Sequence, residues 1–290
     1  MPVAIKSASK CLLILIGLCL LCAMPLAAQD DQYDAKSGYI EALRRIEEAR
    51  IGGTKDLDLS AMRLEELPSE IGQLINLRRL KLTNNNLTML PPEIVQLTNL
   101  LELFLDSNEL ATFPLEISQL TNLEYLYLSN NQLTSLPPEI EHLDHLIVFV
   151  VDYNHLTSLP PQIGNISGLS NLFVLSLSHN QLRTLPSEIG QLTHLYELNV
   201  RDNQLVSLPV ELGYLHPTIL SFSNNPITFP PLEIQRKDQP DMLAYLRDYH
   251  AMLVRQTIVA IAAGIGGIIT LTLAFRWRQR RGLGEKKKRS

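Results

Sequence analysis

The chain has 290 residues, of which 46% are hydrophobic and 19% charged, and its formal net charge at pH 7 is −5. This composition suits one elongated folded domain with additional segments. All three cysteines lie before residue 23, which excludes disulfide bonds and cysteine metal sites from the rest of the chain. Residues 29–256 hold 29 acidic and 15 basic residues, and an acidic surface argues against nucleic acid as a partner.

The first 28 residues have the pattern of a secretory signal peptide. Lys6 and Lys10 precede an apolar run at 11–22, and small residues end the segment at Ala28. We therefore predict a signal peptide over 1–28 and export of the remaining chain.

The exported chain is expected to begin with a linker and a capping helix, 29–53. Residues 29–36 are polar, and we expect them to be loose. From Tyr39 to Arg50 the apolar residues recur at helical spacing on one stripe, and two glycines end the pattern. A helix of this kind would cover the open end of the repeat array that follows.

A repeated unit fills residues 54–230. The stretch from Leu77 to Leu97 returns almost unchanged from Leu100 to Leu120 and from Leu123 to Leu143. A degenerate first unit carries Met62 where the other units carry an asparagine, which makes about eight units. Those asparagines are spaced by 23, 23, 23, 26, 23 and 22 residues: Asn85, Asn108, Asn131, Asn154, Asn180, Asn203 and Asn225. Such a period predicts stacked units that share one continuous core.

The pattern within one unit predicts its local structure. Leu80 and Leu82 alternate with polar residues, as in a short half-buried strand. Asn85 follows where the chain must turn, and a buried amide there can satisfy backbone groups of the turn and of the neighbouring unit. Ile94 and Leu97 lie three residues apart, which directs one face of a short return helix inward.

These residues match the leucine-rich repeat pattern L-x-x-L-x-L-x-x-N-x-L. The 23-residue form with L-P-x-x-I-x-x-L resembles more narrowly the Ras-group class found in plant Ras-group-related and bacterial Roco-type proteins. The resemblance covers roughly residues 40–250. It implies an α/β solenoid that is curved, with a parallel β-sheet on the concave face, short helices on the convex face and helical caps. It also implies a protein-binding role rather than an enzyme, and no GTPase motif follows the repeats.

Three further segments are predicted after the repeats. Residues 231–256 are expected to form a C-terminal capping helix. Residues 257–275 contain no charge and, at 1.5 Å per residue, are long enough to cross a bilayer as one helix. The tail, 276–290, is strongly basic, so the positive-inside rule places it in the cytoplasm and the repeats outside the cytoplasm, at the cell surface or in the periplasm.

The predicted span contains two pairs of small residues at the spacing that lets helices approach closely. They are Ala260 with Gly264 and Ala263 with Gly267. This pattern allows a weak homodimer through the membrane helix. The alternative is that the glycines are ordinary constituents of a span.

The residues between the buried leucines of each strand point outward, and strands stacked about 4.8 Å apart bring these residues side by side. On the middle units this predicts an apolar patch with basic residues at one edge. Its residues are Phe104, Tyr125, Tyr127, Val148, Val150, Tyr153 and Val174, with Arg79 and Lys81 at the edge. Exposed aromatic clusters are typical of protein interfaces. The alternative is that these rings only stabilise the sheet by packing on each other.

The sequence therefore predicts a single-pass membrane protein whose leucine-rich solenoid binds another protein on its concave face. A structural or adhesive protein that acts by self-association or cell contact is the alternative. A signalling receptor would need a partner, because the tail at 276–290 is too short to be an effector. No converging nucleophile and base are found, so no catalytic residue, cofactor or metal is predicted.

Overall fold

The computed structural model describes residues 30–164, 171–215 and 219–258. The predicted signal peptide and basic tail lie outside these ranges, as do all but the first two residues of the predicted membrane span and its small-residue pairs. The three extra residues expected between the fifth and sixth units also fall outside. No helix within the described ranges is long and apolar enough to cross a membrane.

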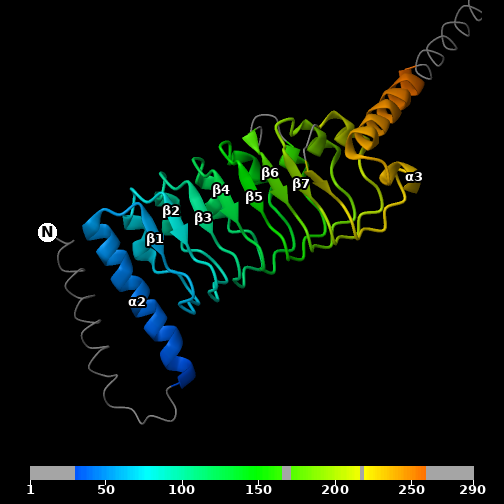
Figure 1. The fold of residues 1–290 in the computed structure, drawn as a ribbon. Coiled ribbons are helices and arrows are strands. Elements are labelled where there is room, and N and C mark those ends of the chain that lie inside the picture. Colours follow the sequence, from blue (N-terminus) through cyan, green and yellow to red (C-terminus); the bar gives the residue numbers. More distant parts are fainter. Residues whose placement is uncertain (1–29, 165–170, 216–218, 259–290) are drawn as a thin grey trace, which may run out of the picture.

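The described repeats form one parallel sheet whose strands follow chain order. Each strand contributes three residues and pairs with the strand of the next unit (Figure 1). The strands are β1 (Asp56–Asp58), β2 (Arg79–Lys81), β3 (Glu102–Phe104), β4 (Tyr125–Tyr127), β5 (Val148–Val150), β6 (Val174–Ser176), β7 (Glu197–Asn199) and β8 (Ile219–Ser221). The predicted solenoid with a parallel sheet is confirmed.

The apolar residue in the middle of each strand faces the core. Leu80 pairs with Leu103, and Leu103 pairs with Leu126, so that these side chains stack in one line. All three are fully buried. No unit could bury its apolar residues alone, and the core is continuous because each coil covers the next.

The coils of β1 to β7 each return through a short 3₁₀-helix, whereas β8 is followed by a short α-helix. The N–H of Ile94 donates to the carbonyl of Pro91, and the N–H of Leu97 donates to the carbonyl of Ile94. A period of three residues brings Ile94 and Leu97 to the same buried side. The described 3₁₀-helices are η3 (Ser69–Gln73), η4 (Pro92–Gln96), η5 (Leu115–Gln119), η6 (Pro138–His142), η7 (Pro161–Gly164), η9 (Ser187–Gln191) and η10 (Val210–Tyr214).

The repeated asparagine joins neighbouring coils. The Asn85 side-chain oxygen accepts from the N–H groups of Met62 and Leu64, and its amide nitrogen donates to the carbonyls of Leu59 and Leu82. The equivalent amides from Asn108 to Asn225 make the same kind of contact. The predicted role of the asparagine is confirmed.

The 3₁₀-helices at the two ends of the array pack more closely than those in the middle. A Cβ atom added at Gly164 would lie 1.9 Å from the carbonyl oxygen of Glu188 on the next coil. The equivalent residues in the middle coils are Val95, Ser118 and Glu141, whose side chains require wider spacing.

The first coil is capped by α2 (Asp30–Gly52), which lies across the end of the array (Figure 1). The helix begins at Asp30, so the segment expected to be loose at 29–36 is helical almost throughout. The chain has no proline or glycine between Asp30 and Ser37 to interrupt it. At Gly38 a Cβ atom would lie 1.9 Å from the carbonyl oxygen of Met62, so glycine is needed for this close approach.

At the other end, α3 (Leu232–Gln235) is followed by a longer helix at 239–258. Met242 and Leu246 of that helix are buried against the last coils. Its later turns lead away from the array (Figure 1).

Candidate functional site

The exposed face of the sheet carries two rows of side chains, one on each side of the buried middle residues. In the first row Tyr125 pairs with Val148, and Val148 pairs with Val174. In the second row Phe104, Tyr127 and Val150 are consecutive. All of these side chains are half-buried. We call them the strand-face patch, which consists of Phe104, Tyr125, Tyr127, Val148, Val150 and Val174.

Two rings of the patch are stacked. The centroids of Phe104 and Tyr127 lie 4.8 Å apart, and their planes differ by 4°. This arrangement follows from the register, because both residues occupy the same place in adjacent strands. The pair forms a flat, rigid aromatic surface on β3 and β4.

Tyr153 extends the apolar surface beyond the carboxyl end of β5. Its ring stacks on His179, with centroids 4.1 Å apart and an interplanar angle of 9°. His179 in turn contacts Asp202 of the next coil, with 3.3 Å between Nε2 and Oδ2. Tyr153 is 52% exposed, and the sequence analysis placed it on the same surface.

The backbone at Tyr153 and His179 is left-handed, with φ of 52° at both residues. Every described coil turns here with a positive φ, and the residue is asparagine in three coils: Asn84, Asn130 and Asn224. Asparagine tolerates this conformation, whereas other side chains cost roughly 1–2 kcal/mol. A tyrosine at this turn therefore has a local backbone cost that asparagine avoids.

The basic residues predicted for the edge of the patch are engaged in ion pairs between strands. Arg79 contacts both carboxylate oxygens of Glu102 at 2.6 Å and lies 3.1 Å from Asp56. Lys81 lies 3.7 Å from Asp58. These partially exposed pairs reduce the positive charge that the edge offers to a ligand.

Two carboxylates lie at the ends of patch strands. Asp106 accepts a hydrogen bond from the backbone N–H of Ser129 at 2.9 Å. Asp152 accepts from the hydroxyl of Ser176 at 2.7 Å and the N–H of Ser178 at 2.6 Å. Desolvation is the main cause that raises the pKa of Asp106, and the nearby charge of Asp152 adds to it.

Desolvation also raises the pKa of the Tyr127 hydroxyl, and the negative charge of Asp106 contributes. The patch is therefore an apolar surface with negative charge beside it.

A third row of side chains, which was not predicted, lies one residue before the first row in each coil. Phe173 and Tyr196 occupy this row and stack with centroids 4.7 Å apart. Both are exposed, and half-buried Ile147 precedes them in the row. The same comparison of equivalent positions, applied to the second residue of the repeat, would have identified them.

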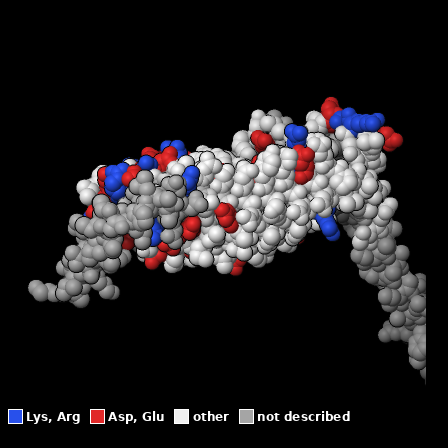
Figure 2. Space-filling model, turned by 90° about the horizontal axis from the view of Figure 1, so that it is seen from below, with Lys and Arg blue, Asp and Glu red and all other residues white. Residues whose placement is uncertain are grey.

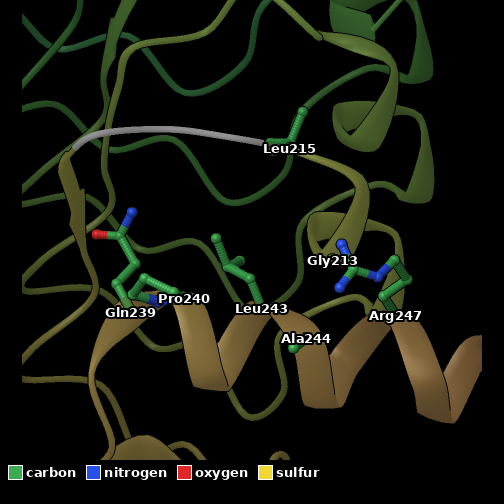
Figure 3. A pocket seen from close by; sticks show the side chains of 7 residues that line it. All are labelled: Gly213, Leu215, Gln239, Pro240, Leu243, Ala244 and Arg247. Atoms are coloured by element: carbon green, nitrogen blue, oxygen red, sulfur yellow. The ribbon is translucent and has the colours of Figure 1, made fainter.

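A pocket of about 320 Å³ lies between the end of η10 and the helix at 239–258 (Figure 3). Leu243 projects from the helix into this space, and Gln239 accepts a hydrogen bond from the N–H of Leu220 at 2.9 Å. A Cβ atom on Gly213 would lie 2.3 Å from the backbone nitrogen of Arg247. These contacts hold the cap to the solenoid. Across the described ranges, no group of three His, Cys, Asp or Glu side chains is placed to hold a metal ion.

Comparison with protein families gives consecutive matches over the coils. A leucine-rich repeat region matches residues 53–127, and leucine-rich repeats match residues 122–143 and 144–205. The units are leucine-rich repeats. No curated protein sequence matches the chain.

Solved leucine-rich repeat structures are similar to this one. A leucine-rich repeat protein of Leptospira interrogans is 37% identical with a TM-score of 0.54, and the alignment covers 67% of this chain and 55% of that one. The ectodomain of the plant membrane receptor kinase GASSHO1/SCHENGEN3 from Arabidopsis thaliana, in complex with CASPARIAN STRIP INTEGRITY FACTOR 2, is 34% identical with a TM-score of 0.51. The PEPR1–AtPEP1 structure is also 34% identical, with a TM-score of 0.53.

The alignments with the GASSHO1/SCHENGEN3 and PEPR1–AtPEP1 structures cover 56% and 59% of this chain, but 20% and 25% of those chains. The chain thus spans about half of the Leptospira protein and a quarter or less of the other two chains.

Proposed function

We propose that this chain is a membrane-anchored protein-binding module that holds a partner protein on the exposed face of its sheet, outside the cytoplasm. The observation that carries the proposal is the strand-face patch, in which stacked Phe104 and Tyr127 adjoin valines on a preformed surface. Flat aromatic side chains contribute large contact areas at low entropic cost, and they are enriched among residues that dominate interface energies. The structural similarity to the leucine-rich repeat ectodomain solved in complex with CASPARIAN STRIP INTEGRITY FACTOR 2, and to the PEPR1–AtPEP1 structure, supports this use of the fold.

Membrane anchoring rests on the sequence after the cap. The end of the described helix supports it, because Met252, Leu253 and Val254 are consecutive and all exposed, and Ile258 is 60% exposed. Met252, Leu253 and Val254 point in different directions around the helix, so its exposed apolar side chains are not confined to one face, and Arg255 and Gln256 lie among them. This arrangement is unfavourable in water and suits a helix that approaches a bilayer.

Two finer points belong to the same proposal. The 23-residue period and the L-P-x-x-I-x-x-L segment assign the repeats to the Ras-group class, and the small-residue pairs in the predicted span allow a weak homodimer.

The alternative function is self-association through the solenoid. In that case, solution scattering of the repeats without the predicted span would show concentration-dependent dimers.

Partner capture tests the binding surface. The full chain would be cross-linked in native membranes and its partners identified, with Phe104→Ala/Tyr127→Ala compared against Met89→Ala/Leu115→Ala. The second pair removes exposed apolar side chains that lie outside the patch. We expect the first pair to lose capture and the second to retain it. Equal capture by both would reject the strand-face patch as the binding surface.

Anchoring and sidedness have their own test. We expect the chain to stay in the membrane fraction during alkaline extraction, and protease added to intact cells to remove the repeats. Release into the soluble fraction, or repeats protected from the protease, would reject this part of the proposal.

A further inference from the structure

Positive charge is absent from the middle of the solenoid. From Leu82 to Leu182 the chain contains ten acidic residues and no lysine or arginine. Figure 2 shows the consequence on one face, where Lys and Arg lie toward the two ends of the array and acidic side chains alone interrupt the uncharged middle. These middle coils are the ones that carry the strand-face patch.

Within the described ranges, Asp106 and Asp152 lie beside the patch without a cationic partner. The ion pairs described on this face involve other carboxylates, and neither of these two residues takes part in one. Both are half-buried and held by hydrogen bonds to the following coils, so they are positioned before a ligand arrives. The raised pKa of Asp106 indicates that solvent and protein stabilise its charge incompletely.

A basic polypeptide fits this combination. A guanidinium group can donate two parallel hydrogen bonds to a carboxylate and can also lie flat against aromatic rings. The two carboxylates are two strand spacings apart, which is about 10 Å and within reach of one extended segment. The acidic middle coils would also attract a basic segment from a distance and repel an acidic one.

We propose that the partner contacts the strand-face patch through a basic polypeptide segment whose arginine side chains pair with Asp106 and Asp152 beside the Phe104–Tyr127 stack. This inference rests on the proposed function and adds the chemical class of the partner.

A labelled nona-arginine peptide is the probe for this inference, with nona-glutamate as the opposite-charge comparison. Binding to the full chain in non-ionic detergent would be measured by fluorescence anisotropy. Asp106→Asn/Asp152→Asn removes two charges at the patch, and Asn retains an oxygen that can accept the Ser129 and Ser178 backbone bonds. Glu116→Gln/Glu139→Gln removes two charges from η5 and η6 on the return side and leaves the net charge of the two variants equal.

We expect nona-arginine to bind, nona-glutamate not to bind, and the patch variant to lose affinity about tenfold, as two partly exposed charge pairs would supply. The return-side variant should change affinity less than twofold. Equal losses in the two variants would reduce the interaction to general charge attraction and overturn the inference. Absence of nona-arginine binding would also overturn it.

The captured native partner distinguishes this inference from the proposed function. If Phe104→Ala/Tyr127→Ala abolishes partner capture but Asp106→Asn/Asp152→Asn leaves it unchanged, the patch is the binding surface and the basic segment is rejected. If both variants lose capture while thermal unfolding shows that both remain folded, both proposals are supported.

Discussion

The ring of Phe104 lies parallel to the ring of Tyr127, 4.8 Å away on the neighbouring strand. The register of β3 and β4 places both residues on the outward side of the sheet. Such a pair can stabilise the sheet and can also serve as a contact surface, and the two roles have different energetic consequences.

A double-mutant cycle measures the stabilising role of the stack. Phe104→Ala, Tyr127→Ala and the double variant should show a coupling free energy of about 0.5–1.5 kcal/mol, the usual value for an aromatic pair. Urea denaturation of the full chain would measure the coupling. A coupling well above that range would indicate that the stack mainly serves the fold and would remove the reason to assign it to partner binding.

The left-handed turn at Tyr153 gives a second prediction. Tyr153→Asn should be more stable than Tyr153→Ala by about 0.5–1 kcal/mol, because asparagine tolerates a positive φ and alanine does not. Both variants lose the stack with His179 equally, so their difference reports only the backbone conformation. Comparison of their urea midpoints measures it, and equal stabilities would show that the turn at this coil carries no strain.

The buried asparagines give a third prediction. Asn131 accepts from the N–H of Leu110 at 3.1 Å and donates to the carbonyls of Leu105 and Leu128 at 3.0 Å. Asn131→Ala would leave these buried groups unpaired and should lower the free energy of unfolding by about 3 kcal/mol.

Asn225 is the control, because it occupies the equivalent place in the last coil and is only half-buried. Water can replace part of the hydrogen bonding of the Asn225 side chain, so Asn225→Ala should lower the free energy of unfolding by about 1 kcal/mol. A loss at Asn131 no larger than that at Asn225 would contradict the proposed link between coils.

Packing on the return side gives a fourth prediction. Gly164→Ala places a Cβ atom 1.9 Å from a backbone oxygen of the next coil, so backbone must move, at a cost of about 1–3 kcal/mol. Gly52→Ala meets nothing within 4 Å and should be neutral or slightly stabilising. Thermal unfolding of the two variants compares them, and similar melting temperatures would contradict the close spacing of these coils.

The pKa of Asp106 gives a fifth prediction. Its folded-state value is raised, so the folded chain binds this proton more tightly than the unfolded chain. The stabilisation that this tighter proton binding provides is complete below the pKa of Asp106 in the unfolded chain. It is lost as the pH rises through the pKa of Asp106 in the folded chain.

Asp106→Asn removes that dependence. The stability of the variant relative to the wild type should therefore increase from pH 3 to pH 7, which parallel urea titrations would measure. A relative stability that is constant with pH, or that falls, would contradict the assignment.

The repeat architecture was predictable because its signals are local and recur. Seven asparagines in phase specify the turns, and the alternation around Leu80 specifies strand direction and register, so neighbours such as Tyr125 and Val148 followed from counting. The buried bonding of Asn85 followed from the same argument, since a turn inside a core leaves backbone groups that need a partner.

Other features depend on contacts between units that the pattern does not contain. The start of α2 at Asp30 was missed because a helix propagates through polar residues that have no apolar stripe. The pairing of Arg79 with Glu102 depends on side-chain conformations across strands, so the alternation of residues places Arg79 at the edge of the patch but does not predict its ion pair. The stack of Tyr153 on His179 joins two turns separated by the irregular unit, where the regular spacing of the repeat is interrupted.

Photo-crosslinking tests the central claim most directly. A photoreactive phenylalanine analogue would replace Tyr127 on the strand face or His142 on η6, on the return side of the same coil, each in the full chain in native membranes. The account predicts that the partner is cross-linked from position 127 and not from position 142. Cross-linking from position 142 with none from position 127 would contradict it.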